Sequence, residues 1–370
     1  MNILVTGGAG FIGSFLVDKL IVNNHKVRIY DNLELQVHHG KIPDYLNKEA
    51  EFIKADICDR DKLNKALKSV DVVFHEAAMV GVGQSMYEVM KYTRVNDLGT
   101  ATLLDLIVNK HRDHIRKMII PGSMSEYGEG LYRCKTCGKV KPEARNHKEL
   151  EQKNWELNCP NCGNILIPIP TNEKTPLHCN SVYALNKRYQ EDVFLTIGKA
   201  FNIPTVSLRY FNVYGPRQSL SNPYTGVAAI FMSRVKAKKS PVIFEDGFQS
   251  RDFISVDDIV SANICVMNNS KANFQIFNVG SGSQITILTI AMTIIELFRS
   301  KLKIEITNQF RKGDVRHCFA DISKIKSIIN WKPRVKFKDG MKELIDWSYN
   351  QKSKDFFDKA AKILKSKGVI

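Results

Sequence analysis

The first thirty residues constrain the fold of this chain more than any other segment. An apolar run, Ile3–Val5, is followed by a glycine-rich turn, by apolar residues at helical spacing, and by a second apolar run that ends in Asp31. This order predicts a strand, a turn, a helix and a second strand. Glycines let the backbone approach a pyrophosphate, and the N-terminus of the following helix favours its negative charge. The segment therefore predicts a dinucleotide-binding βαβ unit.

Asp31 indicates which dinucleotide this unit would take. A carboxylate at the end of the second strand accepts hydrogen bonds from a ribose diol and repels a 2′-phosphate. The position therefore favours NAD over NADP. Because a lone glycine motif is a weak signal, this prediction depends on the complete βαβ context.

Strands and helices continue to alternate after this unit. Apolar runs predict further strands that end at Asp56-Ile57, at His75 and near Ser123, with helical patterns such as Val95–Val108 between them. Such alternation is typical of an α/β protein with a doubly wound parallel sheet, which binds ligands at the carboxyl ends of its strands. His75 and Asn96 fall near such ends, and spacing alone favours a structural role for both.

A serine and a tyrosine–lysine pair carry the candidate chemistry. Ser123 follows a predicted strand, and Tyr183 and Lys187 are four residues apart, which places both side chains on one helix face. A tyrosine has an ordinary pKa of about 10. We expect Lys187 and a nicotinamide cation to lower the pKa of Tyr183, so that it acts as a base while Ser123 hydrogen-bonds the substrate oxygen.

Together these residues resemble the extended short-chain dehydrogenases that modify nucleotide sugars. The resemblance extends along nearly the whole chain, through the segments HEAA (75–78), RYFNVYGPRQ (209–218), SRDFISVDDI (250–259) and GDVRHCFADISK (313–324). It implies an NAD-binding Rossmann domain of residues 1–127 and 171–210. It also implies a smaller nucleotide-sugar lobe, mainly residues 211–370, with some segments returning to the first domain.

The resemblance also implies functional residues. The catalytic residues would be Ser123, Tyr183 and Lys187. The residues expected to contact NAD are Gly7, Gly10, Phe11, Ile12, Gly13, Asp31, Asn32, Asp56, Ile57, Ala77, Ala78, Asn96, Tyr183 and Lys187. The residues expected to contact the substrate are Ser125, Asn212, Arg251 and Arg316, the last three at the diphosphate and nucleoside.

Three reactions are usual among such enzymes: dehydration, epimerisation and net reduction. The 4,6-dehydratases carry an acidic pair directly after the serine, where this chain has Met124 and Ser125, and a methionine cannot donate a proton. Glu126 follows, and we expect it to point elsewhere. Net reduction normally uses NADPH, which Asp31 disfavours. Epimerisation remains, in which a sugar is oxidised to a ketone and reduced from its other face, so that NAD is regenerated.

Finer segments resemble one group within this family, the dTDP-L-rhamnose 4-epimerases, which form dTDP-6-deoxy-L-talose. These segments are DNLELQVHHG (31–40), VGVGQSMYEV (80–89), NPYTGV (222–227) and IFEDGFQSRDF (243–253). We therefore expect 4-epimerisation of dTDP-L-rhamnose with a tightly held NAD. The alternatives are a UDP-hexose 4-epimerase, a nucleotide-sugar 4-ketoreductase and, outside the enzymes, an NAD-sensing protein that binds nucleic acid.

Two Cys-x-x-Cys pairs interrupt the sequence between Ser123 and Tyr183. A glycine follows each pair, and the spacing is C-x2-C-x21-C-x2-C, formed by Cys134, Cys137, Cys159 and Cys162. Four thiolates suit a tetrahedral zinc ion that has no open coordination position. We predict a structural zinc in a zinc-ribbon-like insertion, residues 128–170. It would emerge near the mouth of the active site and cover the sugar pocket or lie at a subunit contact.

The net charge of +16 would suit an anionic partner, but the lysines are spread along the chain. The insertion lacks a basic stripe with stacking aromatics, so we expect no nucleic-acid partner. Without a visible secretory leader or membrane-length apolar run, we expect a soluble cytoplasmic protein and no membrane contact. The resemblance implies a homodimer through helices near 96–111 and 183–200. Residues 345–367 predict an amphipathic helix, to which we assign no function.

Overall fold

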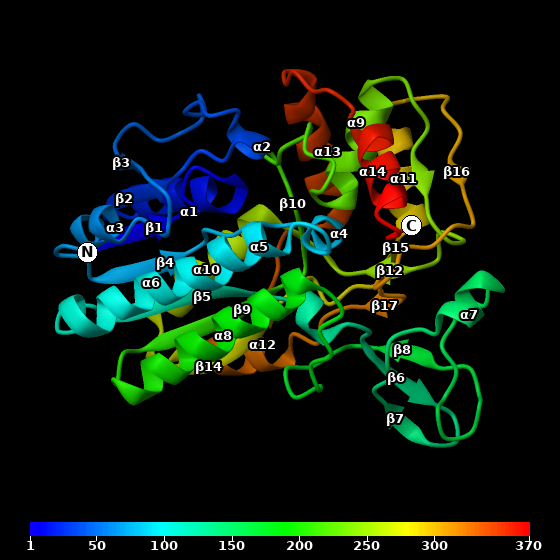
Figure 1. Ribbon diagram of the computed structural model, residues 1–370, viewed down its shortest axis with the longest axis horizontal. Helices are drawn as coiled ribbons and strands as arrows, with labels where there is room; N and C mark the ends of the chain where they lie inside the picture. Colours follow the sequence, from blue (N-terminus) through cyan, green and yellow to red (C-terminus); the bar gives the residue numbers. More distant parts are fainter.

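A seven-stranded parallel sheet forms the centre of the computed structural model, which describes residues 1–370 (Figure 1). Its strand order is β14-β9-β5-β4-β1-β2-β3. The strands are β1 (Asn2–Thr6), β2 (Lys26–Asp31), β3 (Glu51–Lys54), β4 (Val72–His75), β5 (Lys117–Ser123), β9 (Thr205–Tyr210) and β14 (Gln275–Val279). The predicted Rossmann-type doubly wound sheet is confirmed. Because β2 and β4 flank β1 on opposite sides, the crevice opens at the carboxyl ends of β1 and β4.

The third strand ends earlier than the sequence predicts. β3 ends at Lys54 rather than at Asp56-Ile57. The carboxylate of Asp56 accepts a hydrogen bond from the backbone N–H of Cys58 at 2.9 Å, which turns the chain before the next helix.

Helices cover both faces of the sheet because strand side chains alternate between them. Ile3 and Val5 pack against α1 (Phe11–Val22), α10 (Val256–Asn268) and α12 (Ser323–Ile329). Leu4, between them in sequence, packs on the other face against α3 (Arg60–Ala66), α6 (Gly99–Leu106) and α8 (Val182–Ala200). The helix predicted near Val95–Val108 belongs to a longer helical segment, formed by α5 (Val89–Tyr92), η1 (Thr93–Leu98), α6 and η2 (Ile107–His111).

A smaller lobe lies beside the sheet, at the upper right of Figure 1. Its helices are α9 (Val227–Lys236), α11 (Ile287–Leu297), α13 (Phe337–Tyr349) and α14 (Phe357–Ser366). Its short strands, together with those that join it to the sheet, are β10 (Asn212–Tyr214), β11 (Val242–Ile243), β12 (Ser250–Arg251), β13 (Phe253–Ser255), β15 (Ile285–Thr286), β16 (Glu305–Ile306) and β17 (His317–Cys318).

The single amphipathic helix predicted over residues 345–367 is wrong, because the chain there forms two helices. α13 ends at Tyr349 and α14 begins at Phe357. Between them, the N–H of Lys354 donates to Oγ of Ser221 at 3.0 Å, and Asp355 pairs with Lys239 at 3.1 Å. These contacts with another part of the lobe replace the hydrogen bonds of a continuous helix.

The cysteine-containing insertion forms a small unit of its own, at the lower right of Figure 1. Strand β6 (Leu131–Cys134) pairs antiparallel with both β7 (Gly138–Val140) and β8 (Ile167–Ile169), and α7 (His147–Glu151) follows β7 in the chain. Its buried apolar cluster has six residues, two of which are cysteines. None of the helices in the whole structure combines the length and apolar character needed to cross a membrane.

Candidate active site

A cavity of about 600 Å³ lies between the carboxyl ends of the central strands and the lobe. Most of the residues predicted to contact NAD line it: Gly7, Gly10, Phe11, Ile12, Gly13, Asp31, Asn32, Ile57, Ala77, Ala78 and Tyr183. The structure thus brings together residues from the first, second and fourth strand ends, as the βαβ pattern predicts.

The glycine turn and Asp31 form a cradle that fits a dinucleotide. Gly7 has φ +68°, and a Cβ there would lie 2.7 Å from the backbone nitrogen of Ala77, so only glycine fits. Helix α1 begins directly after Gly10, which places a helix N-terminus at the cavity. The carboxylate of Asp31 accepts hydrogen bonds from the N–H groups of Ala9 (3.1 Å) and Leu33 (2.8 Å), which fix its orientation.

Three residues predicted to contact NAD do not line the cavity. Asp56 turns the chain after β3. Lys187 is buried in α8, below Tyr183. Asn96 accepts a hydrogen bond from the N–H of Met79 at 2.8 Å and donates to its carbonyl at 3.1 Å, which braces the segment that follows β4. This contact is a structural role, which is what spacing alone favoured for Asn96.

His75 also has the structural role that its spacing suggested. Its Nδ1 is 2.8 Å from the hydroxyl of Thr6, and its Nε2 is 3.0 Å from that of Thr100. Its ring stacks on Phe194 with 5.5 Å between the ring centroids. Burial, and then the charge of Lys187, lower the pKa of His75 to about 3, so the ring is neutral. It joins β4 to the neighbouring helices.

Ser123 and Tyr183 both line the cavity. Ser123 ends β5 and caps the short helix η3 (Met124–Tyr127), and its Oγ accepts a hydrogen bond from the hydroxyl of Ser125 at 2.8 Å. Tyr183 lies in the first turn of α8, and its N–H donates to Oγ of Ser85 at 3.1 Å. The ends of β5 and α8 therefore bring the candidate hydroxyl groups to one wall.

Lys187 lies one turn after Tyr183 in the interior of α8. Nζ of Lys187 donates to Oε1 of Gln190 at 3.0 Å. Burial lowers the pKa of Lys187 to about 8, against the opposing charges of Glu76 and two other glutamates. Burial raises the pKa of Tyr183 to about 12, and the Ser123 hydroxyl acts in the opposite direction. The Ser123 hydroxyl therefore favours the tyrosinate, and the effect expected of Lys187 with a nicotinamide cation stays a prediction.

The residues after Ser123 are placed as the sequence suggested. Met124 and Ser125 line the cavity, and Glu126 does not. The carboxylate of Glu126 accepts a hydrogen bond from the N–H of Ser123 at 2.6 Å and lies 3.5 Å from the guanidinium of Arg209. Burial, and then the charge of Glu191, raise the pKa of Glu126 to about 8. The cavity therefore has no carboxyl group at the position of the dehydratase acids.

On the lobe side, three of the four residues predicted to contact the substrate line the cavity: Ser125, Asn212 and Arg251. Arg316 does not. Its side chain is 1% exposed, and it donates to carboxylates of Glu156 (3.0 Å), Glu245 (3.0 Å) and Asp246 (2.7 Å). These contacts satisfy the guanidinium away from the cavity, so Arg316 is a structural residue in this arrangement.

Arg311 is a cavity-lining cation that the sequence reasoning missed. Its guanidinium carbon lies 5.0 Å from the centre of the Phe244 ring, and it donates to Asp314 at 2.7 Å. Asp314 also pairs with Arg251 at 3.4 Å. Burial would raise the pKa of Asp314, but Arg311 and Arg251 lower it to about 2, so it stays ionised. Arg251 and Arg311 both line the cavity, and both therefore pair with the same carboxylate, that of Asp314.

The insertion contacts the same segment of the lobe. Arg145 donates two hydrogen bonds to the carboxylate of Glu245, at 2.6 and 2.9 Å, and a third to the carbonyl of Asp314 at 3.0 Å. Glu156, also in the insertion, accepts a hydrogen bond from Arg316 at 3.0 Å. Residues of the insertion thus hold the stretch of chain between Arg311 and Arg316. This stretch reaches the cavity at its Arg311 end.

Glu76 is another cavity residue without a predicted role. Its carboxylate accepts a hydrogen bond from the hydroxyl of Tyr210 at 3.1 Å, and burial raises its pKa to about 7. The available signal was its position in the segment HEAA, directly before Ala77. For Arg311 the signal was a second arginine, five residues before Arg316.

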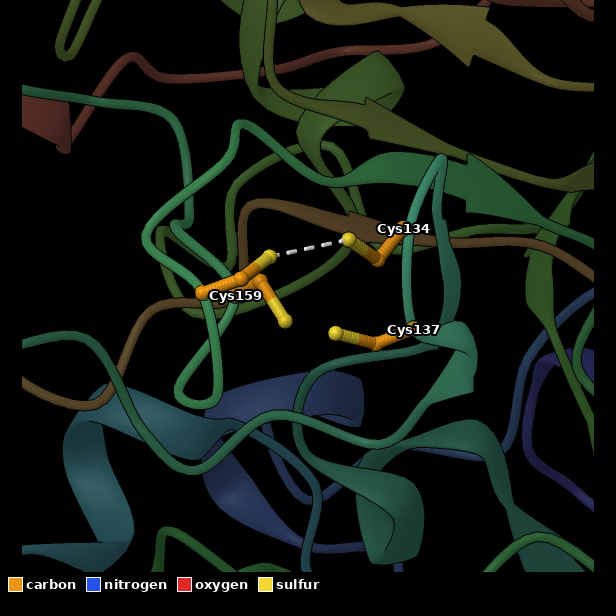
Figure 2. A group of neighbouring side chains, drawn as sticks. Cys134, Cys137 and Cys159 are labelled. Atoms are coloured by element: carbon orange, nitrogen blue, oxygen red, sulfur yellow. Dashed lines mark hydrogen bonds between the residues drawn. The ribbon is translucent and has the colours of Figure 1, made fainter.

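The four predicted cysteine ligands converge (Figure 2). Their Sγ atoms all lie within 4.8 Å of one another, and those of Cys134 and Cys162 are 3.4 Å apart. Each pair is followed by a glycine with positive φ, +78° at Gly138 and +75° at Gly163. The two turns therefore present all four sulfur atoms to one point.

Comparison with known proteins agrees with this fold and site. The NAD dependent epimerase/dehydratase family matches residues 3–146, and the GDP-mannose 4,6 dehydratase family matches residues 163–344. The dTDP-L-rhamnose 4-epimerase of Burkholderia thailandensis is 34% identical over 94% of each chain. Among solved structures, the Thermotoga maritima UDP-glucose 4-epimerase with UDP-glucose gives a TM-score of 0.78 at 31% identity, covering 94% of this chain and 99% of that one. The Bacillus cereus UDP-glucuronic acid 4-epimerase with UDP-glucuronic acid and NAD gives 0.74 at 29% identity, covering 94% and 98%.

The doubly wound sheet, the glycine cradle and the cavity-facing serine and tyrosine define a class of NAD-binding enzymes. The chain belongs to the NAD-dependent epimerase/dehydratase family of extended short-chain dehydrogenases. It is an isomerase that epimerises a nucleotide sugar.

Proposed function

We propose that this enzyme interconverts dTDP-L-rhamnose and dTDP-6-deoxy-L-talose through a 4-keto sugar. One observation carries the epimerase reading: Ser123 and Tyr183 share a wall with the dinucleotide cradle, and no carboxyl group follows Ser123 on that wall. The four segments that resemble dTDP-L-rhamnose 4-epimerases and the 34% identity to one such enzyme support the substrate.

In the proposed reaction, Tyr183 moves the proton. Its Oη takes the proton of the sugar 4-hydroxyl during oxidation and returns it after hydride is delivered to the other face, with Ser123 hydrogen-bonding the same sugar oxygen. NAD, when bound, supplies the acceptor and donor of hydride at C4. Lys187, buried in α8 one turn after Tyr183, supplies a positive charge that favours the deprotonated tyrosine. The shielded cavity keeps the ketone next to the cradle.

Arg251 and Arg311 are proposed to bind the diphosphate. Both guanidinium groups line the cavity, and arginine suits phosphate oxygens because it donates charge-assisted, often bidentate hydrogen bonds. Holding the substrate by its diphosphate leaves the sugar free to present either face of C4. Arg311 takes the place that the sequence gave to Arg316.

The test is to incubate the purified chain with dTDP-L-rhamnose, without added cofactor or reductant, and to follow the sugar by proton NMR. A second anomeric signal that grows to a stable mixture is the expected result, and it would also indicate tightly held NAD. Conversion of UDP-glucose but not of dTDP-L-rhamnose would replace the substrate and keep the mechanism. No reaction without NADPH, but net reduction of a 4-keto sugar with it, would favour a ketoreductase.

We also propose a structural zinc ion on the four cysteines. With Zn–S distances of about 2.3 Å, the sulfur atoms of a tetrahedral site are about 3.8 Å apart. The distances within this cluster fit that geometry, and four thiolates leave no open position for a reacting water. An insertion with six buried apolar residues has little core of its own, so a metal would supply much of its stability.

A homodimer through α8 and the η1–α6 segment is a further proposal. These helices lie side by side at the front of Figure 1. Large apolar side chains on them are exposed, Leu98 by 54%, Leu185 by 54% and Tyr189 by 39%. Sedimentation velocity is expected to give a dimer for the native chain and a monomer for Leu185→Glu. A monomeric native chain would contradict the proposal.

A further inference from the structure

The last sixteen residues reach back over the cavity. Phe357, Leu364 and Val369 all line it. These residues belong to α14 and the turn after it, and they lie beyond residue 344, where the family match ends. Figure 1 shows α14 in red, packed beside α9 in the lobe. The family model therefore does not cover this part of the wall.

Charge pairs hold the start of α14 on the lobe. Arg234 of α9 pairs with Asp358 at 2.7 Å and with Asp355, which is 4% exposed, at 3.5 Å. Lys239 pairs with the same two carboxylates, at 2.8 and 3.1 Å. The guanidinium of Arg234 also lies 4.6 Å from the centre of the Phe357 ring. A network of this kind fixes position better than a lone surface pair.

The rest of this segment contacts the substrate cavity at two places, one through Leu364 and one through Val369. Leu364 packs on Gly83, since a Cβ on Gly83 would lie 3.4 Å from its Cδ2. Gly83 belongs to α4 (Val82–Ser85), whose Ser85 accepts the hydrogen bond from the N–H of Tyr183. The carbonyl of Val369 accepts a hydrogen bond at 2.9 Å from the N–H of Lys312, next to Arg311. The segment thus runs from the tyrosine end of the cavity to the arginine end.

We propose that the side chains of Phe357, Leu364 and Val369 are part of the substrate-binding site and keep the 4-keto sugar in the cavity between the two hydride transfers. This inference depends on the proposed epimerisation. With NAD bound, oxidation would break the C4–H bond, transfer its hydride to the nicotinamide and transfer the hydroxyl proton to Tyr183. If the ketone leaves at that moment, the hydride remains on the enzyme as NADH. No oxidant then restores NAD⁺, so that chain stops. An apolar wall that joins both domains prevents this loss.

The test compares Leu364→Ala with Lys362→Ala, an exposed position on the same helix. Removing the leucine opens the wall beside α4, and we expect the KM for the sugar nucleotide to rise about tenfold, the loss typical of a few missing apolar contacts. We also expect reduced-nicotinamide absorbance to build up during turnover while the rate falls with time. Lys362→Ala is expected to keep the steady rate of the native chain.

Asp358→Asn gives a second route to the same result, because it loosens the anchor of α14 without altering the wall. A folded Leu364→Ala or Asp358→Asn protein with native KM and no accumulation of NADH would overturn the inference. If the native chain itself converts neither dTDP-L-rhamnose nor UDP-glucose, the proposed function fails instead. The two failures are therefore distinguishable.

Discussion

Replacing Tyr183 by phenylalanine is expected to lower kcat about 100- to 10,000-fold, the range that a positioned acid–base group contributes. In the proposed reaction the Tyr183 hydroxyl handles the proton in both hydride transfers. The substitution removes only this oxygen and keeps the ring. The contact that anchors the start of α8 uses the backbone N–H of Tyr183, so the helix should remain in place. Proton NMR of the sugar measures the rate, and the NAD content of the purified protein shows whether the cradle is intact.

Tyr349→Phe is the matched control for this substitution. Tyr349 is 58% exposed at the end of α13 and does not line the cavity, and its ring packs on Phe298 with 5.5 Å between centroids. The same loss of an oxygen there should leave kcat unchanged. If Tyr183→Phe kept most of the native kcat, another group would have to move the proton, and the assignment of Tyr183 would be wrong.

Removal of the proposed zinc is expected to weaken substrate binding as well as stability. In Cys137→Ser one of the four ligands is lost, and we expect the zinc content to fall from one ion per chain to almost none. Zinc binding can contribute about 10 kcal/mol to the folding of a small unit. Without it, Arg145 and Glu156 would no longer hold the segment that carries Arg311. The KM should rise about tenfold, equivalent to losing one charge-assisted hydrogen bond of about 1.5 kcal/mol.

Cys265→Ser controls for the loss of a thiol elsewhere. Its sulfur lies in α10, 3.7 Å from the carbonyl of Ile329, away from the insertion. This variant should keep its zinc and its native KM. Metal analysis, thermal unfolding and kinetics are the measurements. A zinc-free Cys137→Ser protein with native melting temperature and native KM would show that the insertion folds and acts without metal.

Local sequence patterns predicted the parts of the site that depend on local geometry. The glycine turn, Asp31, Ser123 and Tyr183 each follow from a strand end or a helical spacing, and the structure brings them to one cavity. The predicted place of Arg316 in the cavity was wrong because residues distant in the sequence determine the surroundings of its side chain. Its side chain meets Glu156, which the insertion brings from 160 positions away in the sequence.

The segment after α13 could not be predicted for a similar reason. Its residues have the periodicity of a helix. It breaks before Phe357 because of contacts with distant parts of the chain, namely the ion pairs with Arg234 and Lys239 and the hydrogen bond to Ser221. Contacts with the cavity from Leu364 and Val369 follow from that break. Periodicity identifies an apolar helix face, and it does not identify what the face covers.

The pairing of β6 with β8 has a consequence for how the chain folds. Ser123 and Tyr183 must meet although 60 positions separate them. Leu131 opposes Ile169 in this pairing, so the insertion leaves and rejoins the chain at almost the same point. Once the insertion has formed, the effective loop between the two catalytic groups shrinks to about 20 residues, which lowers its closure entropy cost by about 1 kcal/mol. Early folding of the insertion would therefore speed the assembly of the active site around it.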